Sequence, residues 1–568
     1  MKKLLFLILT LCFAAPIFAL APNCSAADQR PIQLMQAELK RGLKTFKKQK
    51  PPIYYLAYTY TDQTTYDLWV NANGVIDELP NLTHYLEVTA RAGSEKMDNT
   101  RTLSNGDRAA YVHATDLVPS PMDGNALPFR RYLWELTQQA AEQAQTDFDR
   151  VHADSQTSAQ RQDDSDDFVL PARASFCRTQ SPVTLDTEQL KEMLVRVSNA
   201  ARGHQEVISS LFSLSLEQGT RYFVDSVGSQ IVTPFLQLSL VYSLRGKTPD
   251  GLELTRSKHY HVLDPTDLPD EETLRRDIEK SLTELNELLA APEAEPVTVP
   301  TILNNRAMAV FVHEVLGHRM EGHRQKQNAF GKTFTDKIGQ PVTAPFITIV
   351  DDATLQFFNG QPLRGFYEYD DEGVQVRPVT LVENGVLREF LMSSSPIKGF
   401  KNSNGHGRRE IGKSPVARMG VTRLIASQTV PYEELEKQLI AEVKRQGKPY
   451  GYVIDDLSGG FTRLYSGGAQ MFKLTPQYVW RIYPDGRKEI VRGADIAGTP
   501  LVSFSKIKAA ADDYAVFNGD CGAESGWVPV SAIAPSVLLE SLEIEKTAKS
   551  PSKPPILPGP MAILPEEK

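Results

Sequence analysis

The chain has 568 residues, of which 41% are hydrophobic and 23% are charged, so it is long enough and apolar enough to build two sizeable globular domains. Its formal net charge of −8 does not favour nucleic-acid binding. The acidic balance mainly favours solubility.

The first 27 residues have the pattern of a secretory signal peptide. Met1 is followed by two lysines and an apolar run over residues 4–20, and Ser25-Ala-Ala27 offers small residues for cleavage before Asp28. The apolar run is short for a membrane span, and the Ala-Pro-Asn before Cys24 is not typical of a lipid-attachment cysteine. We therefore expect a cleaved product that acts outside the cytoplasm, in the periplasm or as a secreted protein, with no membrane attachment after cleavage.

Residues 28–295 are predicted to form an N-terminal α/β domain. The expected helices are 31–48, 133–149 and 270–289, and the expected strands are 54–60, 65–70 and those within 207–244. Residues 156–167 are polar and end in Asp-Asp-Ser-Asp-Asp, which indicates a solvated loop rather than a metal site, because no turn fixes the aspartates. The segment 290–296, rich in Ala, Glu and Pro, indicates a domain boundary.

Residues 296–546 are predicted to form a C-terminal domain made mostly of strands. The predicted elements are strands at 376–381 and 478–483, turns at Glu383-Asn-Gly385 and Pro484-Asp-Gly486, and a helix at 432–446. The last segment, residues 547–568, is rich in Pro, Lys and Ser and is expected to be a disordered tail.

The segment Ala309–His323 is an apolar helical run that holds two histidines five residues apart, with Glu314 beside the first. Neutral imidazoles bind Zn²⁺, and an adjacent carboxylate can take a proton from the water on the metal, which is the chemistry of a peptidase centre. On an ideal α-helix, His313 and His318 would point about 140° apart. One metal therefore takes both only if the helix deforms or stops, and Gly317 is where either change costs least.

A purely structural interpretation of this helix is the alternative. Three apolar residues share one face and would pack in a core in any case: Val312, Val315 and Leu316. That interpretation does not explain Glu314 beside two histidines, because a buried charge is costly without a partner such as a metal. The motif therefore favours metal binding, and Asn304 or Asn305 is expected to cap the start of the helix.

The His-Glu-x-x-x-His spacing from His313 to His318 resembles the motif of the TldD/PmbA metallopeptidases, and other segments resemble landmarks of that family in the same order. These segments are Asp351-Asp352, Asp370-Asp-Glu-Gly373, Val382-Glu-Asn-Gly-Val-Leu387, Asn404-Gly-His-Gly-Arg-Arg409, Arg418-Met419, Leu457-Ser-Gly-Gly460, Val491-Arg-Gly-Ala-Asp495, Asn518-Gly-Asp-Cys-Gly522 and Val528-Pro-Val530. The resemblance covers about residues 300 to 546 and is weak before about residue 200. It implies an α+β protein of two domains, in which an antiparallel β-rich C-terminal domain carries the motif helix at its start.

The resemblance also implies a zinc site made by His313, His318 and Cys521. A thiolate is a good Zn²⁺ ligand, and three protein ligands leave the fourth position open for water, whereas structural sites usually close with four. Glu321 and His323 follow the histidine pair and are the competing candidates for the third ligand.

The cysteines leave a further alternative. If the signal is cleaved after Ala27, Cys12 and Cys24 are lost and only Cys177 and Cys521 remain. An oxidising compartment would permit these two to form a disulfide, which would abolish the proposed ligand.

The function that the resemblance implies is hydrolysis of short or unfolded peptides by a zinc-dependent peptidase. Glu314 is the expected general base, which takes a proton from the zinc-activated water and passes it to the leaving amine. The family implies a two-subunit assembly, either a homodimer or a heterodimer with a paralogous subunit. Two alternatives stay open: a non-catalytic peptide-binding or assembly subunit with a structural metal, and a peptidase of the common zinc-helix type with a downstream glutamate as third ligand.

Two sets of residues could contact a substrate. Ser458-Gly-Gly460 and Ser466-Gly-Gly468 could line a groove in which a peptide pairs with a strand edge, although ordinary tight turns are the favoured interpretation. Arg408, Arg409 and Arg418 could hold a carboxylate, but arginines in β-rich proteins more often satisfy internal groups.

Overall fold

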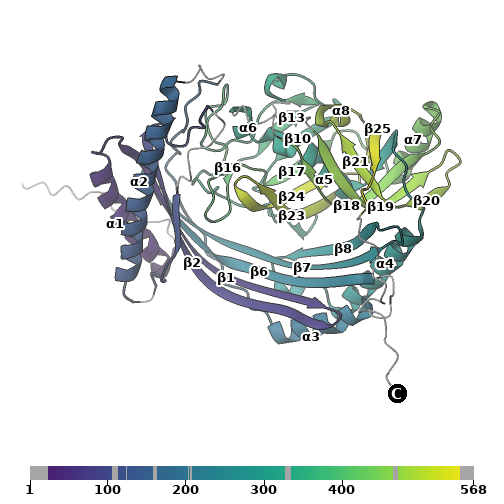
Figure 1. Cartoon of the computed structure of the whole chain (residues 1–568), viewed down its shortest axis with the longest axis horizontal. Coiled ribbons are helices and arrows are strands. Elements are labelled where there is room, and N and C mark those ends of the chain that lie inside the picture. The colour runs from purple at the N-terminus through teal and green to yellow at the C-terminus, as the bar shows by residue number, and fades with distance from the viewer. Residues whose placement is uncertain are drawn as a thin grey trace, which may run out of the picture.

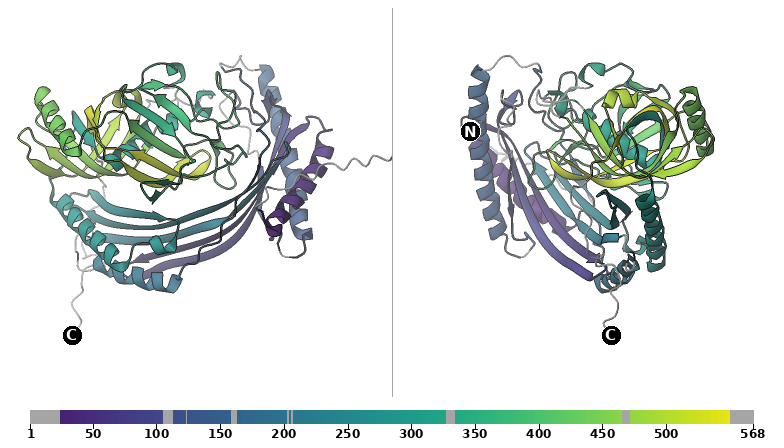
Figure 2. Two further views of the ribbon diagram at one scale, coloured as in Figure 1. Left: turned by 180° about the vertical axis from the view of Figure 1, so that it is seen from behind. Right: turned by 45° about the vertical axis from the view of Figure 1, so that its right-hand side comes forward.

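Two strand-rich halves face each other in the computed structural model, which describes residues 24–104, 113–122, 124–157, 163–201, 204, 207–326, 334–464 and 471–549. The N-terminal half is built on an 8-stranded sheet in the order β3-β2-β1-β6-β7-β5, with β4 beside β2 and β8 beside β7. This sheet curves around the C-terminal half, which lies on its concave side (Figures 1 and 2). The α+β class expected from the sequence is confirmed.

The strands of the curved sheet are long. They are β1 (Ile53–Asn71), β2 (Gly74–Ser94), β3 (Met97–Asp98), β4 (His113–Leu117), β5 (Ser175–Cys177), β6 (Val207–Asp225), β7 (Gln230–Lys247) and β8 (Glu253–Val262). The two short strands expected at 54–60 and 65–70 are one strand, β1, which pairs along nearly its whole length with β2 and β6.

The curved sheet has one apolar and one polar face, because successive side chains of a strand point to opposite sides. On the convex face, Tyr58 and Tyr60 pack under α1 (Ala26–Phe46) and α2 (Leu127–Thr157), and Leu238 and Leu240 pack under α3 (Thr187–Ser198) and α4 (Glu271–Ala290). The residues between them face the C-terminal half and are mostly polar: Ser215, Ser239, Ser257, His259 and His261. The sheet thus forms a core on one side and lines a cavity on the other.

The C-terminal half contains a 6-stranded sheet in the order β14-β13-β10-β17-β24-β23 and a 7-stranded sheet in the order β18-β9-β25-β21-β19-β20, with β22 beside β25. The first consists of β10 (Ile347–Asp351), β13 (Val379–Glu383), β14 (Val386–Leu387), β17 (Val421–Ala426), β23 (Ala515–Ala523) and β24 (Gly526–Ala534). The second consists of β9 (Val297–Leu303), β18 (Gly451–Thr462), β19 (Phe472–Ile482), β20 (Lys488–Val491), β21 (Ala494–Gly498), β22 (Ile507–Ala510) and β25 (Val537–Lys546). Most neighbours are antiparallel, as expected, but β17 runs parallel to β24 and β9 to β18.

Shorter elements complete this half. They are α7 (Tyr432–Arg445), α8 (Pro500–Phe504), the pair β11 (Phe357–Phe358) and β12 (Gln361–Pro362), and the pair β15 (Gly407–Arg408) and β16 (Val416–Ala417). The helix expected at 432–446 is confirmed as α7. The Asn384-Gly385 turn is confirmed too: both residues have positive φ angles and join β13 to β14.

The motif helix α5 (Asn305–Val315) belongs to the core of the C-terminal half. Phe311 packs on Phe472 of β19, with ring centroids 5.6 Å apart, and Ala307 and Met308 are fully buried. A helix that is apolar on nearly every side must be enclosed, and here strands of both sheets enclose it.

Two ion pairs, one buried and one partly exposed, join the two halves. Arg409 binds Glu87 of β2 through both guanidinium NH2 groups, one of them at 2.8 Å, and the Gly412 N–H donates to the same carboxylate at 2.8 Å. Arg178 also donates to Glu368 at 2.8 Å.

The structure differs in part from what the sequence predicts for the loop at 156–167 and for the C-terminal tail. Within 156–167, Asp163 and Asp167 are buried rather than solvated, because Ser165 and Arg101 donate hydrogen bonds to them. Residues 158–162, the Leu4–Leu20 apolar run and most of the predicted tail lie outside the described residues. The first residues of that tail are not free: the Thr547 hydroxyl donates to Asp495 at 2.7 Å.

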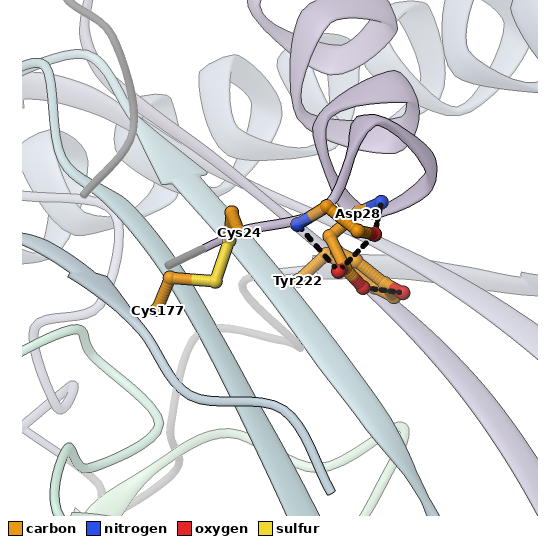
Figure 3. The surroundings of a disulfide bond; sticks show 5 residues. Cys24, Asp28, Cys177 and Tyr222 are labelled. Carbon is orange, nitrogen blue, oxygen red and sulfur yellow. Dashed lines mark hydrogen bonds between the residues drawn. A yellow bond between two sulfur atoms is a disulfide. The ribbon is translucent and has the colours of Figure 1, made fainter. Parts of the chain in front are cut away.

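A disulfide joins Cys24 to Cys177, with Cα atoms 5.8 Å apart (Figure 3). Cys521 is a free, buried thiol. The alternative pairing of Cys177 with Cys521 is therefore wrong, since Cys177 lies on β5 beside the start of α1 and Cys521 lies on β23. Ser25 caps α1 in a reciprocal capping box with Asp28, and Tyr222 donates a hydrogen bond to Asp28 at 3.3 Å. No helix within the described part of the chain is long and apolar enough to cross a membrane.

Candidate metal centre

The motif helix stops between the two histidines. Helix α5 ends at Val315, Leu316 has φ −107° and ψ −53°, and residues Gly317–Met320 continue as a 3₁₀ turn. Because the chain leaves the regular helical path at Leu316, the angle of about 140° expected on an ideal helix no longer applies, and the two imidazole rings lie with their centroids 5.1 Å apart. The deformation expected from the five-residue spacing is thus confirmed.

Gly317 is needed at this break for a different reason from the one expected. Its φ angle is not in the left-handed region, but a Cβ atom there would lie 2.0 Å from the Sδ atom of Met419. The expected cap is also only partly right. Asn304 occupies the N-cap position but makes no capping bond, because its amide donates to Asp455 and accepts from Tyr432 instead.

Three predicted ligands converge where the helix breaks. The Sγ atom of Cys521 lies 3.1 Å from Nε2 of His313 and 3.4 Å from Nε2 of His318. All three side chains are buried, and they form the one cluster of His, Cys and acidic residues with metal-ligand spacing found in the described residues. Ligands about 2.0 to 2.3 Å from a tetrahedral Zn²⁺ ion lie roughly 3.5 Å from one another, so the donor set and its spacing fit zinc.

Electrostatics favour the ligand form of the cysteine. Burial alone would raise the pKa of the Cys521 thiol and lower the pKa of both imidazoles. The attraction between thiolate and imidazolium outweighs burial, so the pKa of Cys521 lies well below its usual value and the pKa values of His313 and His318 lie above theirs. The thiolate is the form that binds metals.

Glu314 lies beside the cluster and lines the cavity that the three cluster residues also line. It is half-buried, and its Cγ atom would lie 3.3 Å from a Cβ atom placed on Gly460 of β18. Glu314 therefore packs against β18 and lines the same cavity as the three-residue cluster.

The competing third ligands do not join the cluster. Glu321 accepts from Nδ1 of His318 at 3.2 Å, on the ring edge opposite the cluster, and it also binds Arg324. His323 instead contacts the carboxylate of Glu524. Glu321 therefore stands behind a ligand, a role that its spacing in the sequence did not reveal.

A cavity of about 940 Å³ opens in front of the cluster, between the two halves. Its floor is the polar face of the curved sheet, and His259 and His261 are the titratable groups there. Its walls include β18 from Leu457 to Thr462 and β23 from Phe517 to Ala523. Both walls have an unpaired edge among the described strands, because β23 is the last strand of its sheet and β9 pairs only with residues 452–454 of β18.

Gly459 and Gly460 therefore lie within a strand rather than in the tight turn that is the favoured interpretation of the sequence. The second glycine pair, 467–468, lies outside the described residues.

The three candidate arginines have internal partners, as the alternative interpretation predicted. Arg418 is fully buried and donates to the carbonyl oxygen of Cys521 at 2.5 Å. Arg408 donates to the carbonyl oxygen of Met419, and Arg409 binds Glu87. None of these contacts leaves the guanidinium group directed at a substrate carboxylate.

Comparisons with known proteins show a family to which the C-terminal half is similar. Residues 296–546 match the family model described as the PmbA/TldA metallopeptidase C-terminal domain. A metalloprotease of Methanocaldococcus jannaschii is 25% identical over 358 residues, which cover 62% of this chain and 72% of that protein. A protein of Saccharolobus solfataricus named as a zinc metalloprotease TldD homolog is 25% identical over 247 residues, which cover 43% of this chain and 51% of that protein.

A solved structure extends the likeness beyond the matched domain. TldE from Thermococcus kodakarensis superposes with a TM-score of 0.60 at 17% identity, over 90% of this chain and 100% of that chain. At this identity the likeness concerns the fold, and it includes the N-terminal half, where the sequence resemblance is weak.

Proposed function

Because the chain belongs to the TldD/PmbA family through its C-terminal domain, we propose that it is a zinc-dependent peptidase with its centre at His313, His318, Cys521 and Glu314. The observation that carries this proposal is the convergence of two imidazoles and one free thiol beside a carboxylate in a cavity. The name of one relative as a zinc metalloprotease supports zinc as the metal.

The residues divide the work of hydrolysis. His313, His318 and Cys521 would hold a zinc ion, which when bound lowers the pKa of a water molecule and polarises the scissile carbonyl. Glu314 accepts the proton of the attacking water and returns it to the leaving amine. Three ligands rather than four leave room for that water, which is the pattern of catalytic rather than structural zinc sites.

The cavity supports short or unfolded peptides as substrates. An extended peptide can satisfy its backbone groups on the free edge of β18 or β23, and such pairing does not depend on the peptide's sequence. A folded protein would have to bring its own secondary structure into a space of about 940 Å³ between the two halves. We infer that main-chain hydrogen bonds supply most of the affinity.

The substitution Glu314→Gln tests the proposal. The variant is expected to bind zinc as the wild type does and to lose cleavage of a mixed peptide library, because only the proton acceptor is removed. Glu433→Gln, on the exposed first turn of α7, is the matched control and should keep full activity. If Glu314→Gln cleaves as fast as the wild type, the mechanism fails. If the zinc-loaded wild type cleaves nothing, the chain is a binding or assembly subunit.

We also propose that the protein acts outside the cytoplasm. The Cys24–Cys177 disulfide supports this location, because disulfides persist mainly in oxidising compartments. The basic and apolar pattern of residues 1–20 supports it independently. Fractionation of cells that express the full chain, followed by immunoblotting, is the direct test, and recovery in the cytoplasm alone would contradict the proposal.

A two-subunit assembly is proposed on the resemblance to the family, and the structural likeness to a protein named TldE is consistent with a paralogous partner. Light scattering on the purified protein is expected to give twice the chain mass if the assembly is a homodimer. A monomer would direct attention to a paralogue as the missing subunit.

A further inference from the structure

We propose that Glu321 is a positioning residue for the metal centre, which holds His318 in the orientation and tautomer that metal binding needs. The inference rests on the proposed zinc site. It concerns a carboxylate that contacts one residue of the cluster, His318, on the ring edge that faces away from Cys521.

The two histidines differ in what supports them. Nε2 of His318 faces Cys521, and its Nδ1 lies 3.2 Å from Oε1 of Glu321. An ionised carboxylate accepts but does not donate, so in the neutral ring Nδ1 carries the proton and Nε2 keeps its lone pair for a metal. Nδ1 of His313 has no hydrogen-bond partner among the described residues. Only one of the two rings is therefore fixed by a carboxylate.

Glu321 is itself held in place by two buried arginines. Arg324 donates from Nε to Oε2 at 2.7 Å, and Nε of Arg418 lies 3.4 Å from Oε1. The side chains of Glu321 and Arg418 are completely buried, and that of Arg324 is 3% exposed. With neither side chain able to move into solvent, the carboxylate has one position, and the ring of His318 is aligned to it.

Arg418 extends this support to the third ligand. The same guanidinium group that faces Glu321 donates from NH2 to the carbonyl oxygen of Cys521. It also donates to the hydroxyl of Ser525 at 2.8 Å, in the turn that follows β23. One arginine thus connects the carboxylate behind His318 with the backbone that carries the thiol, so two of the three ligands share one support.

The substitution Glu321→Gln in the full-length protein tests this role. It keeps the shape of the side chain but removes the charge that fixes the proton on Nδ1. Outer carboxylates of this kind typically contribute about 10- to 100-fold in metal affinity. We expect the zinc dissociation constant, measured by competition with a chelator, to rise by about that factor. The visible spectrum of the Co²⁺-loaded variant should change as well, because the ring of His318 is free to tilt.

Glu524→Gln is the matched control. Glu524 is a second carboxylate bound to Arg324, at 2.9 Å, but it contacts His323 rather than a ligand. The Glu524→Gln variant should lower the melting temperature of the metal-free protein about as much as Glu321→Gln does. It should change the zinc dissociation constant less than about threefold. If both variants weaken zinc binding equally, or if Glu321→Gln binds zinc as tightly as the wild type, Glu321 is merely structural.

A double variant and the wild-type zinc measurement distinguish two further outcomes. If Glu321→Gln alone does not fold, the double variant Glu321→Gln/Arg324→Gln removes one charge of each sign and carries the same prediction for zinc. If the wild-type protein binds no zinc in the same assay, the proposed metal centre fails, and the positioning role fails with it. Wild-type zinc binding with an unchanged Glu321→Gln variant overturns the positioning role alone.

A second observation, the disulfide, carries an independent inference about maturation. We infer that any leader is removed before Cys24, rather than after Ala27 as the small residues suggest. Cys24 is bonded to Cys177, Ser25 caps α1, and Asp28 accepts from Tyr222, so residues 24–28 are part of the fold (Figure 3). Cleavage after Ala27 would remove the cap and leave the 7%-exposed Cys177 as an unpaired thiol.

Forming this bond removes two protons and two electrons from the thiols, and the disulfide of an extracytoplasmic thiol oxidase takes them up. Mass spectrometry of the exported protein, digested without reduction, is expected to give a cross-linked peptide that contains Cys24 and Cys177. N-terminal sequencing should give a first residue at or before position 24. A mature chain that starts at Asp28, or a free Cys177 in the exported protein, would overturn the inference.

Discussion

Nε2 of His313 lies 3.1 Å from Sγ of Cys521, although the two residues are 208 positions apart in the chain. The helix α5 and the edge strand β23 supply the two atoms, and the core of the C-terminal half holds both elements. The position of the thiol therefore depends on the folding of the whole C-terminal half. Removing the thiol should weaken metal binding more than it weakens the fold.

Cys521→Ser is expected to lose zinc affinity by several orders of magnitude, because a neutral hydroxyl replaces a thiolate. Equilibrium dialysis followed by metal analysis measures the change. Stability should follow by linkage: excess Zn²⁺ should raise the melting temperature of the wild type and have little effect on the variant. A variant that keeps one tightly bound zinc per chain would show that the third ligand lies elsewhere.

Gly317→Ala should destabilise the fold at the helix break, because the new Cβ atom would lie 2.0 Å from Sδ of Met419. Overpacking of this kind costs about 1 to 3 kcal/mol. The double variant Gly317→Ala/Met419→Ala provides the control, since it removes the clashing atom and should recover zinc affinity even though a cavity remains. Urea unfolding and chelator competition on both variants measure the two effects. An unchanged single variant would show that the 3₁₀ turn adjusts freely.

Removal of one partner of the ion pair between Glu87 and Arg409 should strongly destabilise the fold. Glu87→Gln is expected to lower the free energy of unfolding by about 3 to 5 kcal/mol, because it leaves a buried guanidinium group without its counter-charge. Glu87→Met/Arg409→Met should recover most of that loss. Glu383→Gln, which breaks the exposed pair with Arg388, is the control and should cost less than about 1 kcal/mol. Equal losses for the two single variants would contradict the argument.

Stability should fall as the pH falls from about 6.5 to about 4, in part because of His261. Burial, with the nearby Arg364 charge, lowers the pKa of His261 to about 4. Over this window the unfolded chain takes up a proton that the folded chain does not, so acid favours unfolding, by up to about 3 kcal/mol. His261→Gln should flatten this part of the stability profile, whereas His152→Gln, on the exposed side of α2, should not. Identical profiles for all three proteins would contradict the assignment.

The sequence was sufficient for the elements with a clear period and for the break between the two histidines. The helices at 270–289 and 432–446 follow from apolar spacing, and Asp270 also caps the first of them, so both depend on neighbours in the chain. The five-residue histidine spacing predicted that the helix must stop, and the structure ends α5 at Val315. The cysteine entered through a family resemblance, since no local rule connects position 521 with position 313.

Other features depend on contacts between distant segments and were beyond local reasoning. Gly317 is required by Met419, which lies in a different element, and no period in the sequence connects them. Glu321 and His323 both follow His318 closely, which makes them competing candidates for the third ligand, with His323 ahead, and only the direction of each side chain shows that neither joins the cluster. The partner of Cys177 was missed because the expected cleavage site removed Cys24 from consideration.

The two-faced sheet of the N-terminal half has a consequence for evolution. Its convex side holds the helices, and its concave side supplies the serines and histidines of the cavity floor. Exchanging Ser215, Ser239 or Ser257 would reshape the chamber without disturbing the layer beneath it. Substitutions on the concave face could therefore change which ligands the cavity admits while the fold stays the same, so the cavity lining and the fold can diverge at different rates among related proteins.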